Sequence, residues 1–515
     1  MAGIGATVLA GGAYGYRKPV AVLHHGCVVG IRGSFGREGA CRCFDCHFAR
    51  RCPRLLCSCK LVCSISLKQF HSWLRKLVAL LLNWIQEREE THEKKGILNL
   101  LEIASLERSL KLGLGSALET LCGQAFGAGP IHHHMLGIFL QRALVVLYGA
   151  CIPISFLFIY MEHILLLLGQ DPHISEKAGE YALCLLPSIY GYALLQPVVK
   201  FLQTQSVVLP MMICSAGSLA LHVGISYTLV YMLGLGFRGA ALATSLSFWL
   251  NAIFLVCYVR FSGVCKHTWE GFSKNAFVDL REFLGLAIPS CIMICLEYWC
   301  FEVLVILAGL LPNPELELAT LSVCLTTTSL NYMIPFGLSA AASTRVSNEL
   351  GAGDAPAAKQ AVVSVVSLSA TQALVISSVL LSLRHQWAWL FSGDAEVVDS
   401  VAEILPFVAC IALLDGIQGV LSGVARGCGW QELGAIINLG AFYGVGVPTS
   451  ALLAFEFNFG GRGLFLGLIC GLATQTLILL CVTLRTDWER QVRKVAARIL
   501  HEEADLLEDK SGERS

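Results

Sequence analysis

The sequence predicts an all-α, polytopic membrane protein, and its composition, its low charge and the length of its apolar segments carry that prediction. Hydrophobic residues make up 55% of the 515 residues, charged residues only 14%, and the mean hydropathy is +0.65. A soluble chain carries about a quarter charged residues, so this chain cannot cover a large apolar core with polar surface. Its formal net charge is +0, so no overall field attracts nucleic acid, and no nucleic-acid partner is expected.

Long apolar segments follow one another from about residue 135 onward, separated by short polar breaks. Each is close to the roughly 20 residues that a helix needs to cross a bilayer core of about 30 Å. The segments are continuous and do not alternate with a period of two, which disfavours the strands of a membrane barrel. The ten predicted membrane-spanning helices are 136–160, 181–199, 208–233, 238–259, 283–310, 317–342, 360–383, 401–424, 433–455 and 463–484.

Lysines and arginines in the short loops predict the orientation of these helices. Alternate loops lie on opposite sides of the membrane, and the side richer in positive charge is expected to be cytoplasmic. The poorer set holds only Lys177, Arg238, Arg384 and Arg462. The richer set, on the side of the C-terminal tail, comprises Lys200, Arg260, Lys266, Lys274, Arg281, Arg345, Lys359 and Arg426.

The chain also contains an internal repeat. Residues 113–129 align without a gap with residues 337–353, and both stretches end in Gly-Ala-Gly. The same offset places Arg238 and Gly239 opposite Arg462 and Gly463, just before the last helix of each half. Two matches in one register indicate a duplication, which predicts two pseudo-symmetric helical lobes with a substrate path between them.

The first 111 residues depart from this pattern. The repeat predicts counterparts of 283–310 and 317–342 at 59–86 and 93–118, but both windows contain several charged residues. Each charge at a helix centre costs about 2.5–3.5 kcal/mol, so neither window is expected to cross the membrane. The predicted organisation is an atypical Cys-rich and charged region at 1–111, an incomplete N-lobe at 112–262, a C-lobe at 263–485 and a cytoplasmic tail at 486–515. The cysteines of the first region show no zinc-ligand spacing, so no metal site is expected.

Residues 118–129, LETLCGQAFGAG, resemble the signature that closes the second helix of plant multidrug and toxic compound extrusion (MATE) transporters of the DETOXIFICATION type. Further matching segments are 194–197, 201–206, 345–353 and 423–427. The resemblance covers roughly residues 112–485. It implies twelve helices in two lobes of six, of which the first one or two are missing or altered here. It also implies a secondary active transporter that exports small organic compounds, xenobiotics or secondary metabolites, in exchange for protons.

Two acidic residues lie at membrane depth. Glu297 is near the middle of 283–310, and Asp415 is deep within 401–424. Intramembrane acids are costly, and a carboxyl group in a low-dielectric site can take a proton from one side and release it to the other. We therefore predict that Glu297 and Asp415 couple transport to protons; the alternative is a pair of hydrogen-bonded structural carboxylates. The resemblance implies the same role, because both match acidic C-lobe positions implicated in proton coupling.

Other residues are candidates for a substrate cavity. Phe301 shares the helical face of Glu297 and can stack against a flat substrate, although an aromatic side chain there can equally be packing. Asn331 and Tyr332 precede Pro335, which is expected to kink their helix and free a carbonyl group; helix–helix contact is the alternative. Gln196 and Asn438 are weaker candidates.

No Walker A motif and no catalytic triad or paired-acid arrangement is found in the sequence, so ATP is not expected to drive the protein directly. The proton gradient is the energy source that the resemblance implies. We expect no cofactor, no enzymatic activity, and a monomer whose partners are protons, lipid and a small organic substrate. The expected location is the plasma membrane or the vacuolar membrane, with the C-terminus in the cytoplasm. Two alternatives remain at this point: a membrane-inserted but inactive product of a damaged or mispredicted gene, and a membrane-embedded enzyme.

Overall fold

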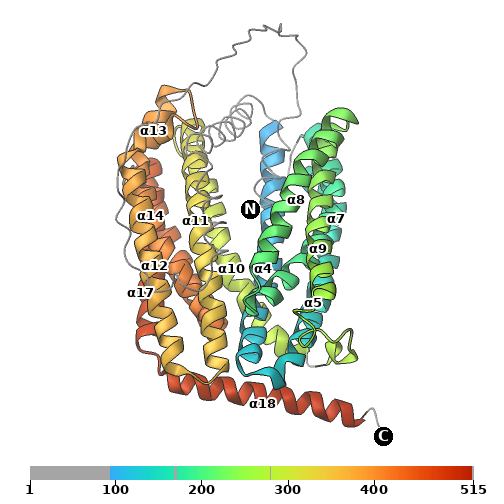
Figure 1. The fold of residues 1–515 in the computed structure, drawn as a ribbon. Helices are drawn as coiled ribbons and strands as arrows, with labels where there is room; N and C mark the ends of the chain where they lie inside the picture. The colour runs from blue at the N-terminus through green and yellow to red at the C-terminus, as the bar shows by residue number, and fades with distance from the viewer. Residues whose placement is uncertain (1–92, 168–170, 279, 513–515) are drawn as a thin grey trace, which may run out of the picture. The chain divides into compact units, whose positions relative to one another are not determined.

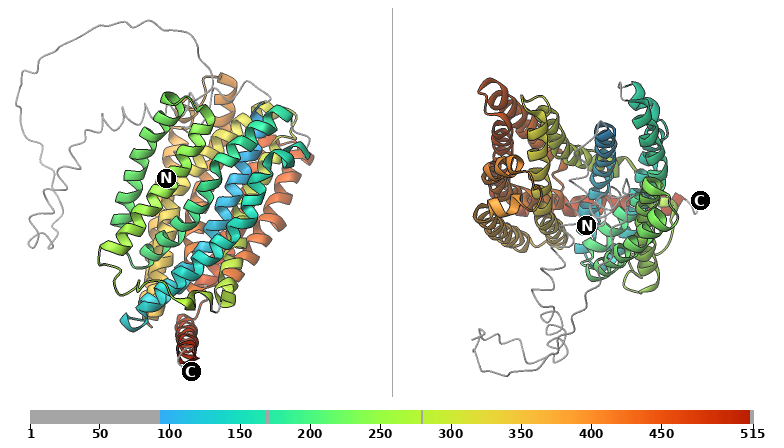
Figure 2. Two further views of the ribbon diagram at one scale, coloured as in Figure 1. Left: turned by 90° about the vertical axis from the view of Figure 1, so that its right-hand side faces the viewer. Right: turned by 90° about the horizontal axis from the view of Figure 1, so that it is seen from above.

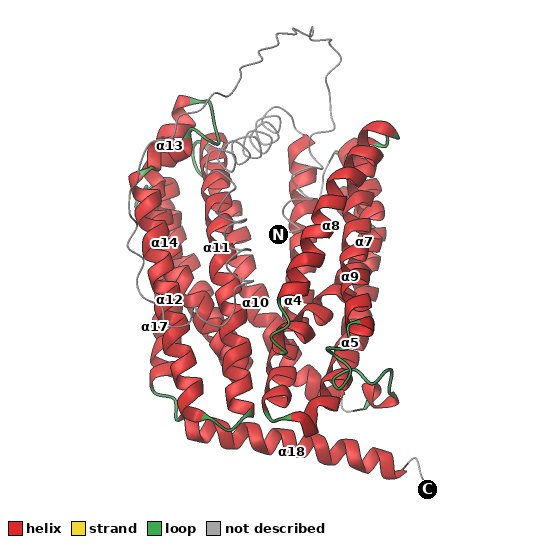
Figure 3. Cartoon of the chain, in the orientation of Figure 1, coloured by secondary structure: helices red, strands yellow, loops and turns green. Residues whose placement is uncertain are grey.

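The computed structural model describes residues 93–167, 171–278 and 280–512, and within them the chain forms helices and no strand (Figure 3). The predicted window at 59–86 and the Cys-rich run lie outside the described residues. In the described part, nine helices are long and apolar enough to cross a membrane: Pro130–Ile159, Pro172–Thr204, Leu209–Met232, Gly236–Phe261, Leu280–Ala308, Ala355–Ser382, Ala395–Cys428, Gln431–Glu456 and Gly460–Leu484. These confirm an all-α membrane protein.

The helices divide between the two halves that the repeat predicts (Figures 1 and 2). The first half comprises α4 (Glu93–Gly127), η2 (Pro130–His132), α5 (His133–Ile159), α6 (Met161–Leu167), α7 (Pro172–Thr204), α8 (Leu209–Tyr227), η3 (Thr228–Met232) and α9 (Gly236–Phe261). After the short η4 (Lys274–Phe277), the second half comprises α10 (Leu280–Ala308), α11 (Pro314–Gly351), α12 (Ala355–Ser382), α13 (Arg384–Ala388), α14 (Ala395–Cys428), α15 (Gln431–Asn438), η5 (Leu439–Gly446), α16 (Val447–Ala451), η6 (Leu452–Glu456) and α17 (Gly460–Leu484). The C-terminal helix α18 (Trp488–Gly512) runs across one end of the bundle (Figure 1).

The duplication extends to irregular backbone. A short π-helical stretch precedes the last helix of each half, η3 in the first and η6 in the second, and the two stretches lie at the offset of the sequence repeat. The following helices both begin at a glycine with positive φ, Gly236 at 54° and Gly460 at 55°. Only glycine adopts this conformation without steric cost, so the same turn is built twice. Shared irregularities of this kind support duplication more strongly than shared apolar composition does.

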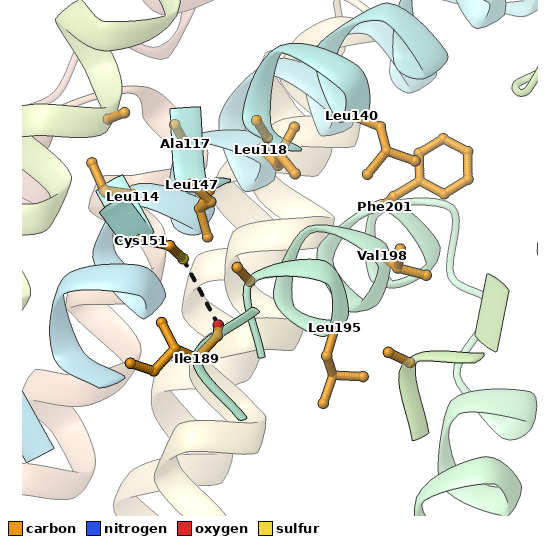
Figure 4. Close-up of a cluster of buried hydrophobic side chains, with 14 of the residues drawn as sticks. Leu114, Ala117, Leu118, Leu140, Leu147, Cys151, Ile189, Leu195, Val198 and Phe201 are labelled. Atoms are coloured by element: carbon orange, nitrogen blue, oxygen red, sulfur yellow. Dashed lines mark hydrogen bonds between the residues drawn. The ribbon is translucent and has the colours of Figure 1, made fainter. Parts of the chain in front are cut away.

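The core of the first half forms where α4, α5 and α7 meet (Figure 4). Leu118, Leu147 and Phe201 are fully buried there, and the Cys151 thiol points to the carbonyl oxygen of Ile189 at 3.8 Å. Cys151 thus serves as a small apolar side chain within a packed core. The second half has its own buried clusters, one of which joins α11, α12, α14 and α18.

Helix α4 is continuous across residues 111 and 112 and packs against α5, α7, α10 and α11. It is not among the nine apolar helices, and the expectation that the window 93–118 does not cross the membrane stays a prediction. Lys111, one of these charges, is fully buried. It pairs with Glu107 one turn away, and its Nζ donates to the carbonyl of Ile189 at 2.8 Å. Pairing and hydrogen bonding reduce the cost of burying an ionisable side chain.

The tenth predicted span, 317–342, lies within α11. Thr326, Thr327, Thr328 and Asn331 interrupt its apolar sequence, and it is not among the nine apolar helices of the described chain. Two of these threonine hydroxyls, on Thr327 and Thr328, donate to backbone carbonyls one turn earlier, at 2.9 and 3.0 Å. These two threonine hydroxyls are therefore hydrogen-bonded within α11 itself, whereas Asn331, from the same segment, is discussed with the candidate site below.

The placement of Lys200 and Arg426 in loops is wrong. Helix α7 continues to Thr204 and α14 to Cys428, so both residues lie inside helices and are buried. Both form ion pairs with the same acidic residue, Glu119, described below. They therefore carry no weight in the comparison of loop charges between the two sides.

Candidate functional site

Glu297 of α10 and Asp415 of α14 come close together within the second half. Asp415 is 3% exposed and Glu297 is half-buried, and the two carboxyl groups lie within electrostatic range of each other. Gln418 is fully buried and donates from Nε2 to Glu297 Oε2 at 3.4 Å and to Ser422 Oγ at 3.0 Å. Asp415, Gln418 and Ser422 are spaced by three and four residues, so α14 presents them on one face. That face meets Glu297.

Tyr332 of α11 completes this cluster. Its side chain lies within electrostatic range of both Glu297 and Asp415, and its ring packs where α14 has only a glycine. A Cβ atom on Gly419 would lie 3.5 Å from the Tyr332 ring. The neighbouring Asn331 is 7% exposed, and within the described chain neither polar atom of its amide has a hydrogen-bond partner. A buried amide without a partner is costly, which marks this position as one that can receive a ligand or water.

The other predicted cavity residues lie in different surroundings. Phe301 packs against the apolar cluster of the second half. Gln196 of α7 is half-buried and lies beside Gly115 of α4. Asn438 is fully buried; its Nδ2 donates to the Met293 carbonyl at 2.8 Å, and its Oδ1 accepts from Gln475 at 2.7 Å. The structure thus brings Glu297, Asp415 and Tyr332 together, while the roles of all these residues stay predictions.

A second buried cluster, centred on Glu119 of α4, was missed in the sequence. Glu119 is 1% exposed, pairs with Lys200 of α7 through Oε1, and accepts from Arg426 Nε of α14 through Oε2 at 3.0 Å. Arg426 Nη2 also donates to Ser339 Oγ of α11 at 2.8 Å, and Thr120 Oγ1 donates to the Arg426 carbonyl at 2.5 Å. One acidic side chain therefore ties two helices of the first half to the second half.

The sequence did carry a signal for this cluster. Glu119 is an acid inside an apolar Gly- and Ala-rich segment, and the cost of such acids applies to it as much as to Glu297. Its partners were hidden because Lys200 and Arg426 fall just beyond the predicted ends of their spans. No single-sequence pattern shows that residues so far apart along the chain meet.

Arg426 links the two clusters. Its guanidinium lies within electrostatic range of Glu119, Tyr332 and Glu297. Because α14 carries both Asp415 and Arg426, a change of charge at the acid pair alters the field on the arginine that holds the first half. Helix α14 therefore joins the acid pair to the contact between the halves.

Comparison with known proteins agrees with this architecture. The MatE family matches residues 100–228 and 289–452. Protein DETOXIFICATION 16 of Arabidopsis thaliana is 52% identical over 391 residues, which cover 76% of this chain and 80% of that protein. Protein DETOXIFICATION 17 of the same plant is 49% identical, over 75% of this chain and 81% of its own length.

Solved structures show the same fold. The crystal structure of the eukaryotic MATE transporter AtDTX14 is 40% identical in sequence, matches with a TM-score of 0.76, and covers 83% of this chain and 94% of its own. An outward-facing multidrug resistance MATE transporter of the MOP superfamily, 16% identical, shares the fold with a TM-score of 0.71, over 82% of this chain and 94% of its own. The chain belongs to the MATE family.

Proposed function

We propose that this protein is a secondary active transporter that exports small organic compounds, xenobiotics or secondary metabolites, in exchange for protons. Membership of the MATE family supports export, and one of its structural relatives is a multidrug resistance transporter by name. The observation that carries proton exchange is the proximity of Glu297 and Asp415 in the interior of the second half. Gln418, from the helix that carries Asp415, donates to Glu297, so the two acids belong to one polar cluster.

Protonation of this pair changes its surroundings in a defined way. Two ionised carboxylates within electrostatic range repel each other, and a proton on either one relieves the repulsion. A protonated Glu297 can also donate a hydrogen bond, whereas the ionised form only accepts one from Gln418. Loss of negative charge weakens the attraction on Arg426, which is then held more strongly toward Glu119 of the first half. Proton binding thereby favours one arrangement of the halves over the other.

The compound would bind beside the acid pair. Tyr332 offers an aromatic face for a flat substrate, and Asn331 offers an amide with both polar atoms available in the described chain. Phe301 and Gln196 lie in other surroundings and stay candidates for lining the path of the compound. Asn438 contributes only in a conformation that breaks its bonds to Met293 and Gln475. The aromatic and amide groups suit amphipathic organic molecules as a class.

The remaining parts of the proposal concern location and energy. We place the protein in either the plasma membrane or the vacuolar membrane, with its C-terminus in the cytoplasm. The orientation is the same in both cases, because both membranes keep the same side of the protein toward the cytosol. The proton gradient supplies the energy and no cofactor takes part. The transporter acts as a monomer, because each chain carries both halves between which a compound would pass.

Drug efflux from a pump-deficient bacterium tests the proposal. Cells expressing the wild type should expel a planar dye such as ethidium, and a protonophore should abolish the efflux. Glu297→Gln and Asp415→Asn should each lose it, whereas Glu403→Gln, a matched change at an exposed residue of α14, should retain it. A chain that inserts stably but expels none of a panel of dyes and drugs would favour the inactive-protein alternative.

A further inference from the structure

Helix α18 is anchored to the second half by an apolar face. Trp488, Val495 and Ile499 are buried in a cluster with residues of α11, α12 and α14, and Val492 packs partly against it. The positions 488, 492, 495 and 499 recur with the spacing of one helical face. The ring of Trp488 also lies 6.4 Å from that of Trp430, which follows α14. This attachment is made mainly by apolar surface.

The same helix is attached to the first half by charged side chains. Glu502 Oε2 accepts a hydrogen bond from Arg142 Nη1 of α5 at 2.9 Å, and both side chains are almost fully buried. Among the described residues, Nε and Nη2 of Arg142 have no hydrogen-bond partner, so Glu502 provides its one ion pair there. Glu503 Oε2 lies 3.3 Å from Nε2 of His132, the last residue of η2, which immediately precedes α5.

Arg498 lies between these two attachments. Its Nη1 donates to Gln124 Oε1 of α4 at 2.9 Å. The same guanidinium lies against Gly429, the left-handed residue that ends α14, where a Cβ atom would be 3.1 Å away. A cation at a helix C-terminus is favourable because the last carbonyl groups carry partial negative charge. One side chain therefore contacts both halves at once.

From these contacts we propose that α18 is a strap that holds the two halves together at the end of the bundle where it lies (Figure 1). Any rearrangement that parts the halves at this end must break one of its two attachments. Exposing the apolar face of α18 to water would be unfavourable, whereas Arg142, Glu502 and Arg498 can be hydrated once released. The strap thus stays with the second half and releases the first. The ion pair between Arg142 and Glu502 therefore favours the arrangement in which the halves are together at this end over the one in which they are parted.

Hydrogen exchange of the full-length protein in lipid nanodiscs, read by mass spectrometry, tests this directly. Glu502→Gln should speed amide exchange about tenfold or more, both in residues 498–504 and in the facing ends of α4 and α11, because it weakens the closed arrangement. The matched control is Glu489→Gln, an equal change of charge at an exposed position of α18. It should exchange like the wild type.

A double variant in which the two charges are swapped distinguishes loss of the ion pair from misfolding. Arg142→Glu combined with Glu502→Arg should restore slow exchange if the ion pair itself is what holds the strap. Faster exchange confined to α18, with α4 and α11 unchanged, would overturn the proposal, because it would show that the halves stay together without the contacts of α18. Unchanged exchange in Glu502→Gln would overturn it as well. Since exchange is measured without transport, either result is independent of the proposed proton-coupled export.

Discussion

Gly127 of α4 lies directly against the backbone carbonyl of Asn348 in α11, and Gly351 of α11 lies in the same way against the backbone carbonyl of Gln124 in α4. The two glycines are equivalent in the sequence repeat, and so are Gln124 and Asn348. The contact between the halves is therefore reciprocal, as a pseudo-two-fold axis between α4 and α11 requires. Small residues at such crossings are what let helix backbones approach closely.

Gly351→Ala tests this crossing. The added methyl group would meet the backbone of α4, which cannot move aside as a flexible side chain can. We expect a loss of about 1–3 kcal/mol in the free energy of unfolding, measured by thermal unfolding in detergent. Gly337→Ala, in the same helix with open space around it, should be neutral or slightly stabilising, by up to about 1 kcal/mol. Equal effects of the two changes would show that α4 and α11 do not pack as described.

Glu119→Gln tests the buried ion cluster. The change leaves Lys200 and Arg426 buried without their shared counter-charge, so we expect a loss of about 3–5 kcal/mol in the free energy of unfolding. Glu349→Gln removes the acid of a more exposed ion pair, with Arg345 one turn away, and should cost at most about 1 kcal/mol. If both variants unfold at the wild-type temperature, Glu119 does not hold the two halves as the structure indicates.

Asn331→Leu and Asn438→Leu separate a ligand-binding amide from a structural one. Asn331 makes no hydrogen bond within the described chain, so leucine there should leave stability unchanged or raise it by about 1–2 kcal/mol while impairing efflux. Asn438 bridges three helices, so leucine there should lower stability by about 1–3 kcal/mol. Thermal unfolding and efflux, measured side by side, report the two effects. An Asn331→Leu variant that transports normally would remove Asn331 from the proposed cavity.

The apolar spans and the duplication could be predicted from the sequence because both depend on local pattern. The run of residues 113–129 predicted its counterpart at 337–353, and the structure places these two segments against each other. The π-helical stretches and positive-φ glycines at matching positions could not be predicted, because they depend on how neighbouring helices pack.

The candidate site was predictable only where a residue is unusual for its surroundings. Glu297 and Asp415 stand out as acids in apolar segments, but nothing in the sequence shows that their helices are neighbours. Lys200 and Arg426 are expected in loops because a charge ends an apolar run in the sequence, whereas in the structure both are buried in helices and pair with Glu119. Pairing of this kind is a tertiary effect, which hydropathy alone does not report.

Proton movement through purified protein tests the central claim most directly. Proteoliposomes would carry an internal pH-sensitive dye and an imposed pH gradient, and the compound expelled most strongly by cells would be added to them. Proton-coupled exchange predicts that this compound dissipates the gradient with the wild type and with Glu403→Gln, but not with Glu297→Gln or Asp415→Asn. Wild-type movement of the compound without any proton flux, or undiminished coupling in both acid variants, would contradict the account.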